Sequence, residues 1–211
     1  MALLHRATLR PSKLELLASW LPGRPWYQGP ADADVVTRGS YRFDDPAGEV
    51  GLETILVGVA DGPVHQVPLT YRGAPLDGAD EWLVGTTDHA VLGPRWVYDG
   101  TADPVYAAVL AHAILGGAGQ AEEYFEVDGR REPREQNMTI AGSGAGDAGM
   151  PVVGPVRRVV DGDAALIITD AVELVVVRRP VEGAVGAEGA NLSGTWKGQP
   201  TAVPLAYARV R

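Results

Sequence analysis

Residues 52–71, LETILVGVADGPVHQVPLTY, decide the fold that the sequence predicts. Two runs rich in Val, Ile and Leu, 52–60 and 64–71, flank the tripeptide Asp61-Gly62-Pro63. Asp-Gly between two β-branched runs is a strong local signal for a β-hairpin. The loose alternation of the first run indicates a strand with at least one buried face. We therefore expect this hairpin at the centre of a sheet, as a scaffold rather than as a functional site.

A helix is predicted nearer the N-terminus, over residues 12–21. Ser12 has the character of an N-cap, and Glu15 three residues later completes a capping box. Three leucines share one helical face: Leu14, Leu17 and Leu21. Pro22-Gly23 ends the helix. Because it has one apolar face, we expect the helix to pack on the sheet that follows.

The rest of the chain predicts many short strands and one more helix. That helix covers residues 104–115, with Asp103 as N-cap and Pro104 at the favoured first position. Strands are expected at 34–43, 82–87, 91–98, 122–127, 138–141, 152–160, 164–169, 171–179, 192–196 and 202–210. Two helices against so many strands predict an α+β protein dominated by antiparallel sheets. We place a domain boundary near residue 128, which gives segments 1–128 and 129–211.

Composition excludes several classes of function. The 211 residues carry a formal net charge of −9, which argues against binding nucleic acid or anionic lipid. The chain has no cysteine, so disulfides, thiolate metal sites and cysteine nucleophiles are excluded. The N-terminal residues lack the apolar block of a signal peptide, and no apolar run approaches the length of a membrane span. We expect a cytoplasmic protein.

An aromatic segment with a cation, Arg24 to Gly29, is the first candidate site. Aromatic faces bind sugars and cations, so Arg24, Trp26 and Tyr27 could contact a carbohydrate or a partner, together with Trp82 and Trp96. The other interpretation is that Trp26 and Tyr27 close the end of the core. Proline-flanked aromatics favour this second interpretation.

Other patterns give weaker indications. Acidic pairs at Asp44-Asp45, Glu122-Glu123 and Asp161/Asp163 lie at turns or segment ends, where solvated carboxylates are expected. The histidines have no spacing typical of a metal site, so we expect no metal and no cofactor. The glycine-rich run 142–149 lacks the Gly-Lys-Ser/Thr ending of a P-loop and is interpreted as a flexible loop.

The order of several motifs resembles one known family. The helix of residues 14–20 is followed by Leu21-Pro22 and by Trp26-Tyr27-Gln28-Gly29, then by the hairpin with Val67-Pro68-Leu69. Val97-Tyr98-Asp99-Gly100 then leads through Asp103-Pro104 into a helix. In this order and spacing, the first half of the chain resembles the N-terminal cap domain of bacterial maltokinases. The resemblance implies a curved, cystatin-like antiparallel sheet on a helix, preceding a kinase-like core.

The second half resembles the N-lobe of the same kinases, without their catalytic features. The family's nucleotide-phosphate loop finds a shortened match at Glu135, Gln136, Asn137 and Thr139. The family carries a phosphate-pairing lysine shortly before an Arg-Arg pair, and counting back from Arg178-Arg179 puts Val175 at that position. A valine cannot pair with phosphate. The chain reaches Arg211 without the family's His-Gly-Asp motif, so we expect a pseudo-kinase remnant without its C-lobe and without kinase activity.

Two functions follow from this resemblance. The first is a non-catalytic binding or regulatory protein of maltose, trehalose and α-glucan metabolism, acting through a protein partner or a carbohydrate. The second is the nucleotide-binding half of a split sugar kinase, completed by a separate C-lobe chain. A chain that lacks a lobe should expose the surface which that lobe covers, so we also expect a homodimer formed through the second segment.

Overall fold

The structure is a computed structural model that describes residues 2–4, 9–32, 34–60, 62–127, 130–146, 150–181 and 188–211. The hairpin predicted at its centre is present. Strands β4 (Gly51–Gly58) and β5 (His65–Arg72) pair antiparallel, with Ile55 opposite Val67. Asp61, on which the turn was predicted, lies outside the described residues.

This hairpin forms the middle of a six-stranded sheet, which we call the first sheet. The strand order is β2-β6-β7-β5-β4-β3, and every neighbouring pair is antiparallel. The remaining strands are β2 (Leu9–Arg10), β3 (Val36–Phe43), β6 (Leu83–His89) and β7 (Gly93–Asp99). Helix α1 (Lys13–Trp20) covers one face, where Leu16 and Leu17 join a cluster with Ile55, Val57 and Val67.

The C-terminal part of the chain forms a second six-stranded antiparallel sheet, which we call the second sheet. Its order is β10-β14-β15-β13-β12-β11. Its strands are β10 (Met138–Gly142), β11 (Val156–Val160), β12 (Ala164–Thr169), β13 (Val172–Val177), β14 (Ala190–Trp196) and β15 (Gln199–Val210). Strict alternation in β13 buries Val172, Leu174 and Val176 on the inner face of this sheet.

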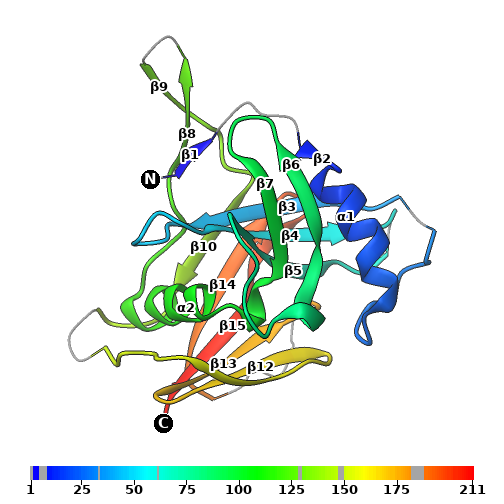
Figure 1. The fold of residues 1–211 in the computed structure, drawn as a ribbon. Coiled ribbons are helices and arrows are strands. Elements are labelled where there is room, and N and C mark those ends of the chain that lie inside the picture. The colour runs from blue at the N-terminus through cyan, green and yellow to red at the C-terminus, as the bar shows by residue number, and fades with distance from the viewer. Residues whose placement is uncertain are drawn as a thin grey trace.

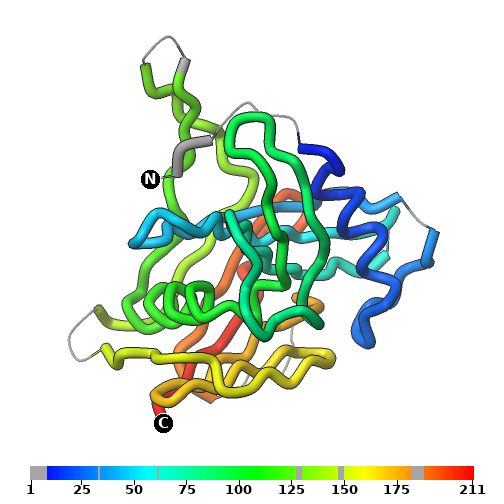
Figure 2. Tube along the Cα trace, viewed as in Figure 1, coloured from blue at the N-terminus to red at the C-terminus, as the bar shows by residue number. Residues whose placement is uncertain are grey.

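Helix α2 (Pro104–Gly116) lies against the inner face of the second sheet. Figure 2 shows the green α2 segment beside the C-terminal strands, far from it in sequence. Its buried face, including Leu110 and Ile114, shares one hydrophobic cluster with Leu174 of the second sheet and with Leu52 and Leu56 of the first. The two sheets and α2 are therefore held together by a continuous apolar core, whose stabilisation scales with the buried area.

A third, smaller sheet combines β1 (Ala2–Leu4), β8 (Glu123–Val127) and β9 (Arg130–Pro133). β1 pairs parallel with β8, and β8 and β9 form a hairpin that extends away from the two large sheets (Figure 1). In the described ranges, short 3₁₀ helices occur at η1 (Leu21–Gly23), η2 (Asp80–Trp82) and η3 (Gly100–Ala102). Within the described residues, no helix combines the length and apolar composition that crossing a membrane requires.

The expected α+β class, with a curved antiparallel sheet packed on a helix, is confirmed. The capping box of Ser12 and Glu15 forms as predicted, and Asp103 accepts a hydrogen bond from the backbone N–H of Val105 at the start of α2. One predicted strand is shorter than expected, because β11 begins at Val156 instead of residue 152. Gly154 with φ +71° and Pro155 precede it, and both interrupt an extended run.

Candidate functional site

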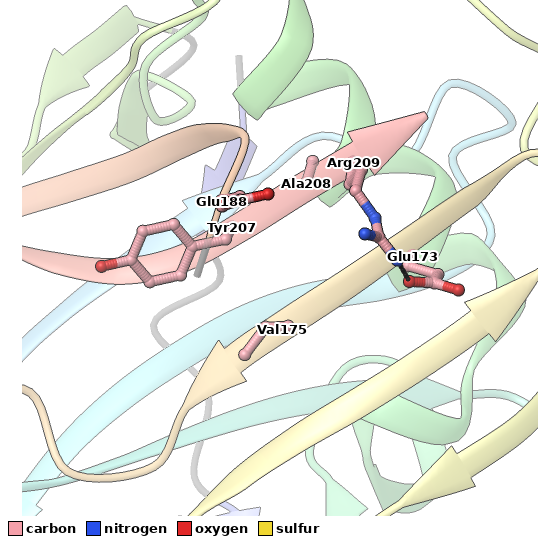
Figure 3. Close-up of a pocket in the computed structure, with 6 residues that line it drawn as sticks. All are labelled: Glu173, Val175, Glu188, Tyr207, Ala208 and Arg209. Atoms are coloured by element: carbon pink, nitrogen blue, oxygen red, sulfur yellow. Dashed lines mark hydrogen bonds and ion pairs between the residues drawn. The ribbon is translucent and has the colours of Figure 1, made fainter. Parts of the chain in front are cut away.

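A hollow lies on the outer face of the second sheet (Figure 3). It has a volume of about 250 Å³. Six residues line it: Glu173, Val175, Glu188, Tyr207, Ala208 and Arg209. Five of them come from β13 and β15, and Glu188 lies just before β14. Since β13 buries its even-numbered residues, the odd-numbered Glu173 and Val175 point outward into this hollow.

The register of the second sheet aligns apolar side chains across this face. Val175 lies opposite Tyr207 on β15 and opposite Leu166 on β12. Leu166 in turn lies opposite Val160 of the edge strand β11, which is 41% exposed. Side chains directly opposite each other on one face are in contact distance. These opposite side chains therefore form a row, which we call the outer apolar row: Val160, Leu166, Val175 and Tyr207. The hollow lies at the end of the row that Val175 and Tyr207 form.

Two carboxylates and two guanidinium groups lie around the hollow, so its charges balance. Glu173 forms a 2.6 Å ion pair with Arg209 and has Arg211 at 3.5 Å. Glu188 is exposed, and no ion pair to it is found among the described residues. The only two lysines of the chain are distant: Lys13 is in α1, and Lys197 lies at the β14–β15 turn. Val175 therefore has no ammonium group near it.

The residues matched to the nucleotide loop do not approach Val175. Glu135 and Thr139 are exposed, beside or within β10. The side-chain oxygen of Asn137 accepts a hydrogen bond from the backbone N–H of Ser40, and Gln136 donates to the carbonyl of Ala121. β10 is an edge strand, and β14 and β15 lie between it and β13. The structure therefore uses Asn137 and Gln136 to join the second sheet to neighbouring segments.

Trp26 lies inside the protein instead of on its surface. It is 1% exposed, and its indole N–H donates a 2.9 Å hydrogen bond to Asp161. The guanidinium of Arg178 lies 4.6 Å from the centre of its ring, and Trp20 makes an edge contact at 5.9 Å. Arg24 stacks in turn on Trp20, at 4.8 Å. The interpretation that Trp26 closes the core matches these contacts, and a buried ring offers no face to a sugar.

Tyr27 and the two other tryptophans lie in separate places. Tyr27 is half-buried, and its ring lies 5.1 Å from the ring of His65. Trp82 lies in η2, and Trp96 lies in β7 opposite Arg72. Both tryptophans are half-buried, and neither makes a ring contact with Trp26 or Tyr27. The predicted aromatic patch is therefore not one continuous surface.

Sequence reasoning missed the most deeply buried charges of the protein. Arg178 is completely buried and forms ion pairs with Asp99 at 2.6 Å and with Asp161 at 2.9 Å. Asp99 is also completely buried, at the end of β7, and accepts a hydrogen bond from the hydroxyl of Thr101. The expectation that Asp161 is a solvated turn carboxylate is wrong, because its side chain is only 13% exposed. The alternation of β13 is a signal for this cluster, since it puts Arg178 on the inner face.

A second buried charge cluster lies under α1. Glu53 of β4 binds the ammonium of Lys13 and lies 3.1 Å from the guanidinium of Arg42. The hydroxyl of Tyr71 also donates to it, at 3.0 Å. Burial alone would raise the pKa of Glu53, but Arg42 and Lys13 outweigh this effect and lower the pKa to about 2. Glu53 therefore fastens α1 to the first sheet as a carboxylate.

No group of three His, Asp or Glu side chains in the described residues is placed to hold a metal ion. The chemistry that these arrangements offer is non-covalent binding: an apolar row, a shallow hollow with charges of both signs and separate half-buried aromatic rings. Comparison with known proteins adds one finding. Residues 20–103 match the family described as the maltokinase N-terminal cap domain.

No curated protein matches the chain. The matched segment runs from the last residue of α1 through the aromatic loop and the strands β3 to β7, and ends at the N-cap of α2. It contains the predicted hairpin and most of the motifs on which the resemblance rests. Residues 20–103, less than half of the chain, are therefore similar to the maltokinase N-terminal cap domain.

Proposed function

We propose that the protein is a non-catalytic binding or regulatory protein of maltose, trehalose or α-glucan metabolism. The match of residues 20–103 to the maltokinase N-terminal cap domain supports the link to that metabolism. The observation that carries the non-catalytic part is Val175, which occupies the position where the kinase resemblance expects the phosphate-pairing lysine. This side chain lines the hollow of the second sheet, where a nucleotide would need a cation.

Electrostatics at the hollow support this proposal. Phosphoryl transfer depends on positive charge that is positioned around the phosphates. Here the lining contains two carboxylates, Glu173 and Glu188, and a single guanidinium that is already paired with Glu173. Lys197 lies in the turn before β15, and Tyr207 is eight residues beyond the start of that strand, or roughly 26 Å at the rise of an extended chain. With Arg211 also paired to Glu173, the hollow has no excess of positive charge to stabilise a triphosphate.

A phosphoryl-transfer assay tests the proposal directly. The full chain is incubated with Mg²⁺ and radiolabelled ATP, alone and with maltose, and both ATP hydrolysis and sugar phosphorylation are followed. We expect neither to exceed the rate of the protein-free control. Turnover that rises in proportion to the protein concentration would show a catalytic function and contradict the proposal.

Carbohydrate contact is tested separately by affinity electrophoresis in gels that contain α-glucan. Tyr27, Trp82 and Trp96 are the half-buried rings that remain available, with Arg24 beside the first of them. If a glucan binds at one of these rings, replacement of that ring by alanine should abolish the retardation. If the ring is Trp96, Trp96→Phe should keep part of the retardation, because an aromatic face remains. Migration that glucan leaves unchanged would favour a protein partner as the ligand.

The alternative, a nucleotide-binding half of a split sugar kinase, has one observation in its favour. Val175, at the position matched to the lysine of the kinases, lines the hollow, so a cavity is present at that position. Its volume of about 250 Å³ is smaller than that of most small-molecule pockets. Binding of ATP that requires a second chain carrying a kinase C-lobe would support this alternative.

A further inference from the structure

We propose that protonation of His65 in mild acid opens residues 27–29 of the aromatic loop (24–29), while the rest of the fold stays intact. The inference does not depend on the proposed function. The loop connects the two large sheets, because the side chain of Trp26 bonds to the β11–β12 turn and the backbone of Gln28 bonds to the start of β5. It also carries the half-buried ring of Tyr27. A change of the loop with pH would therefore change the surface that the protein offers to a ligand.

His65 is the part of this contact whose charge changes in mild acid. It is 1% exposed, and its Nε2 atom accepts the backbone N–H of Gln28 at 3.3 Å. Its ring lies 5.1 Å from the ring of Tyr27 and 6.0 Å from that of Trp26. Only an unprotonated ring nitrogen accepts a hydrogen bond, so a proton on Nε2 makes two donors face each other. The bond that holds Gln28 is therefore lost when His65 becomes charged.

The surroundings of His65 oppose its charged form. Burial, and secondly the neighbouring Arg179, lower its pKa below 6.5. Arg179 is kept at this place by the side-chain oxygen of Gln28 at 2.7 Å and by Asp163 at 3.1 Å. The carboxylate of Asp163 is 79% exposed and already paired with Arg179, and the residue opposite His65 on β4 is the apolar Val57. A second cation at His65 is therefore relieved most easily by movement of the loop.

Trp26 has contacts that do not involve His65, and these confine the opening to residues 27–29. Its indole N–H donates to Asp161 at 2.9 Å, and the guanidinium of Arg178 lies 4.6 Å from the centre of its ring. Asp161 and Arg178 are paired with each other at 2.9 Å. Because neither of these ions changes its charge in mild acid, we expect Trp26 to stay in place when the following residues open.

NMR spectra of the full ¹⁵N-labelled chain, recorded from pH 7.5 down to mild acid, test the proposal. We expect the imidazole signals of His65 to titrate with a midpoint below 6.5, and the backbone amide of Gln28 to follow the same curve. Protection of this amide against hydrogen exchange, corrected for the intrinsic effect of pH, should fall about tenfold, because one hydrogen bond is lost. The indole N–H of Trp26 should stay protected throughout.

His65→Gln removes the titrating group, so the amide of Gln28 should no longer change with pH. His112→Gln is the matched control, because His112 is an exposed histidine on α2, and it should keep the wild-type curve. An amide of Gln28 that stays unchanged while His65 titrates would overturn the proposal, and so would the wild-type curve in His65→Gln. Loss of protection at Gln28, Trp26 and the sheets together would show global unfolding and would also overturn it. The wild-type spectra decide the question even if the variant does not fold.

Discussion

Arg178 shows how one residue connects the two large sheets. Burial acts to lower its pKa, but Asp99 and Asp161 outweigh burial and raise it, so the side chain is charged at every relevant pH. Asp99 belongs to the first sheet, while Asp161 lies in the β11–β12 turn of the second. Trp26 adds a stacking contact and a hydrogen bond to the same cluster. The cluster therefore fastens the aromatic loop and both sheets to one point.

Removing this cation should destabilise the protein strongly. Arg178→Ala leaves two buried carboxylates without their partner, which typically costs about 3–5 kcal/mol. Urea unfolding followed by tryptophan fluorescence measures the loss. Arg157→Ala is the control, since Arg157 pairs with Asp170 on the surface, where both side chains are more than half exposed. That control should leave the unfolding midpoint almost unchanged, and equal effects of the two substitutions would contradict the role of Arg178.

His65 holds the aromatic loop from the other side. Its Nε2 accepts the backbone N–H of Gln28 at 3.3 Å, while its ring contacts Trp26 and Tyr27. Burial, and secondly the neighbouring Arg179, lower its pKa below the ordinary value of 6.5. The side-chain amide of Gln28 meanwhile accepts a hydrogen bond from Arg179 at 2.7 Å. A proton on His65 would remove the acceptor and add a like charge beside Arg179.

This arrangement predicts a loss of stability in mild acid. Because the folded pKa of His65 is lower than the unfolded one, the unfolded chain takes up the proton first as the pH falls below about 6.5. The contribution of His65 is therefore complete above that pH and decreases below it. Urea midpoints of the wild type should fall between pH 7.5 and pH 5.5, and those of His65→Gln should fall less. Parallel pH dependence in the two proteins would contradict this account.

At the scale of elements, local sequence signals predicted most of the helices and strands. The capping box at Ser12 and the Asp103-Pro104 start of α2 work because each signal needs only nearby residues. Strand β9, with its charged residues from Arg130 to Pro133, was missed. It has no apolar alternation, and it exists because it pairs with β8. A strand without apolar alternation cannot be recognised from its own residues, even when its partner is the preceding strand.

The glycine-rich segment after β10 differs from its interpretation as a flexible loop. The backbone N–H of Gly144 donates to the carbonyl of Ile114 at 2.9 Å, and that of Ser143 donates to Asn191. A Cβ atom at Gly142 or Gly144 would lie closer than 3.0 Å to carbonyl oxygens at the end of α2. These two glycines therefore let β10 approach the helix. Residues 147–149 of the predicted loop lie outside the described residues.

Gly144→Ala tests this close approach. The added methyl group meets the backbone of Leu115, which has little freedom to move within α2, so we expect a loss of about 1–3 kcal/mol in the free energy of unfolding. Gly23→Ala is the matched control, because nothing lies within 4 Å of the added Cβ there. Its effect should stay within about 0.5 kcal/mol. A Gly144→Ala protein as stable as this control would contradict the prediction, because it would show that the segment moves to make room for the methyl group.

At the scale of the whole molecule, the two predicted segments share their core. Leu110 and Ile114 of α2 belong to segment 1–128, yet they pack on Leu174 and Leu192 of the second sheet. The boundary near residue 128 lies outside the described residues and stays a prediction. Separate or joint unfolding of the two segments, monitored by calorimetry, is the observation that decides how independent they are.

The sequence predicted the candidate site only in part. The position of Val175 followed from the Arg178-Arg179 pair, and the structure places this side chain in the hollow. The aromatic residues were grouped because they are chemically alike, but Trp26 is buried while Trp82 and Trp96 lie on other elements. Residue type alone does not specify burial or direction, which depend on strand parity and tertiary packing.

Under the proposed function, the hollow at Val175 does not bind a nucleotide. Isothermal titration calorimetry of the full chain with Mg²⁺–ATP tests it most directly. We expect no saturable heat at millimolar ATP, because the two guanidinium groups at the hollow are already paired with Glu173 and no lysine lies near. Saturable one-to-one binding of ATP that is lost in Val175→Asp would contradict it.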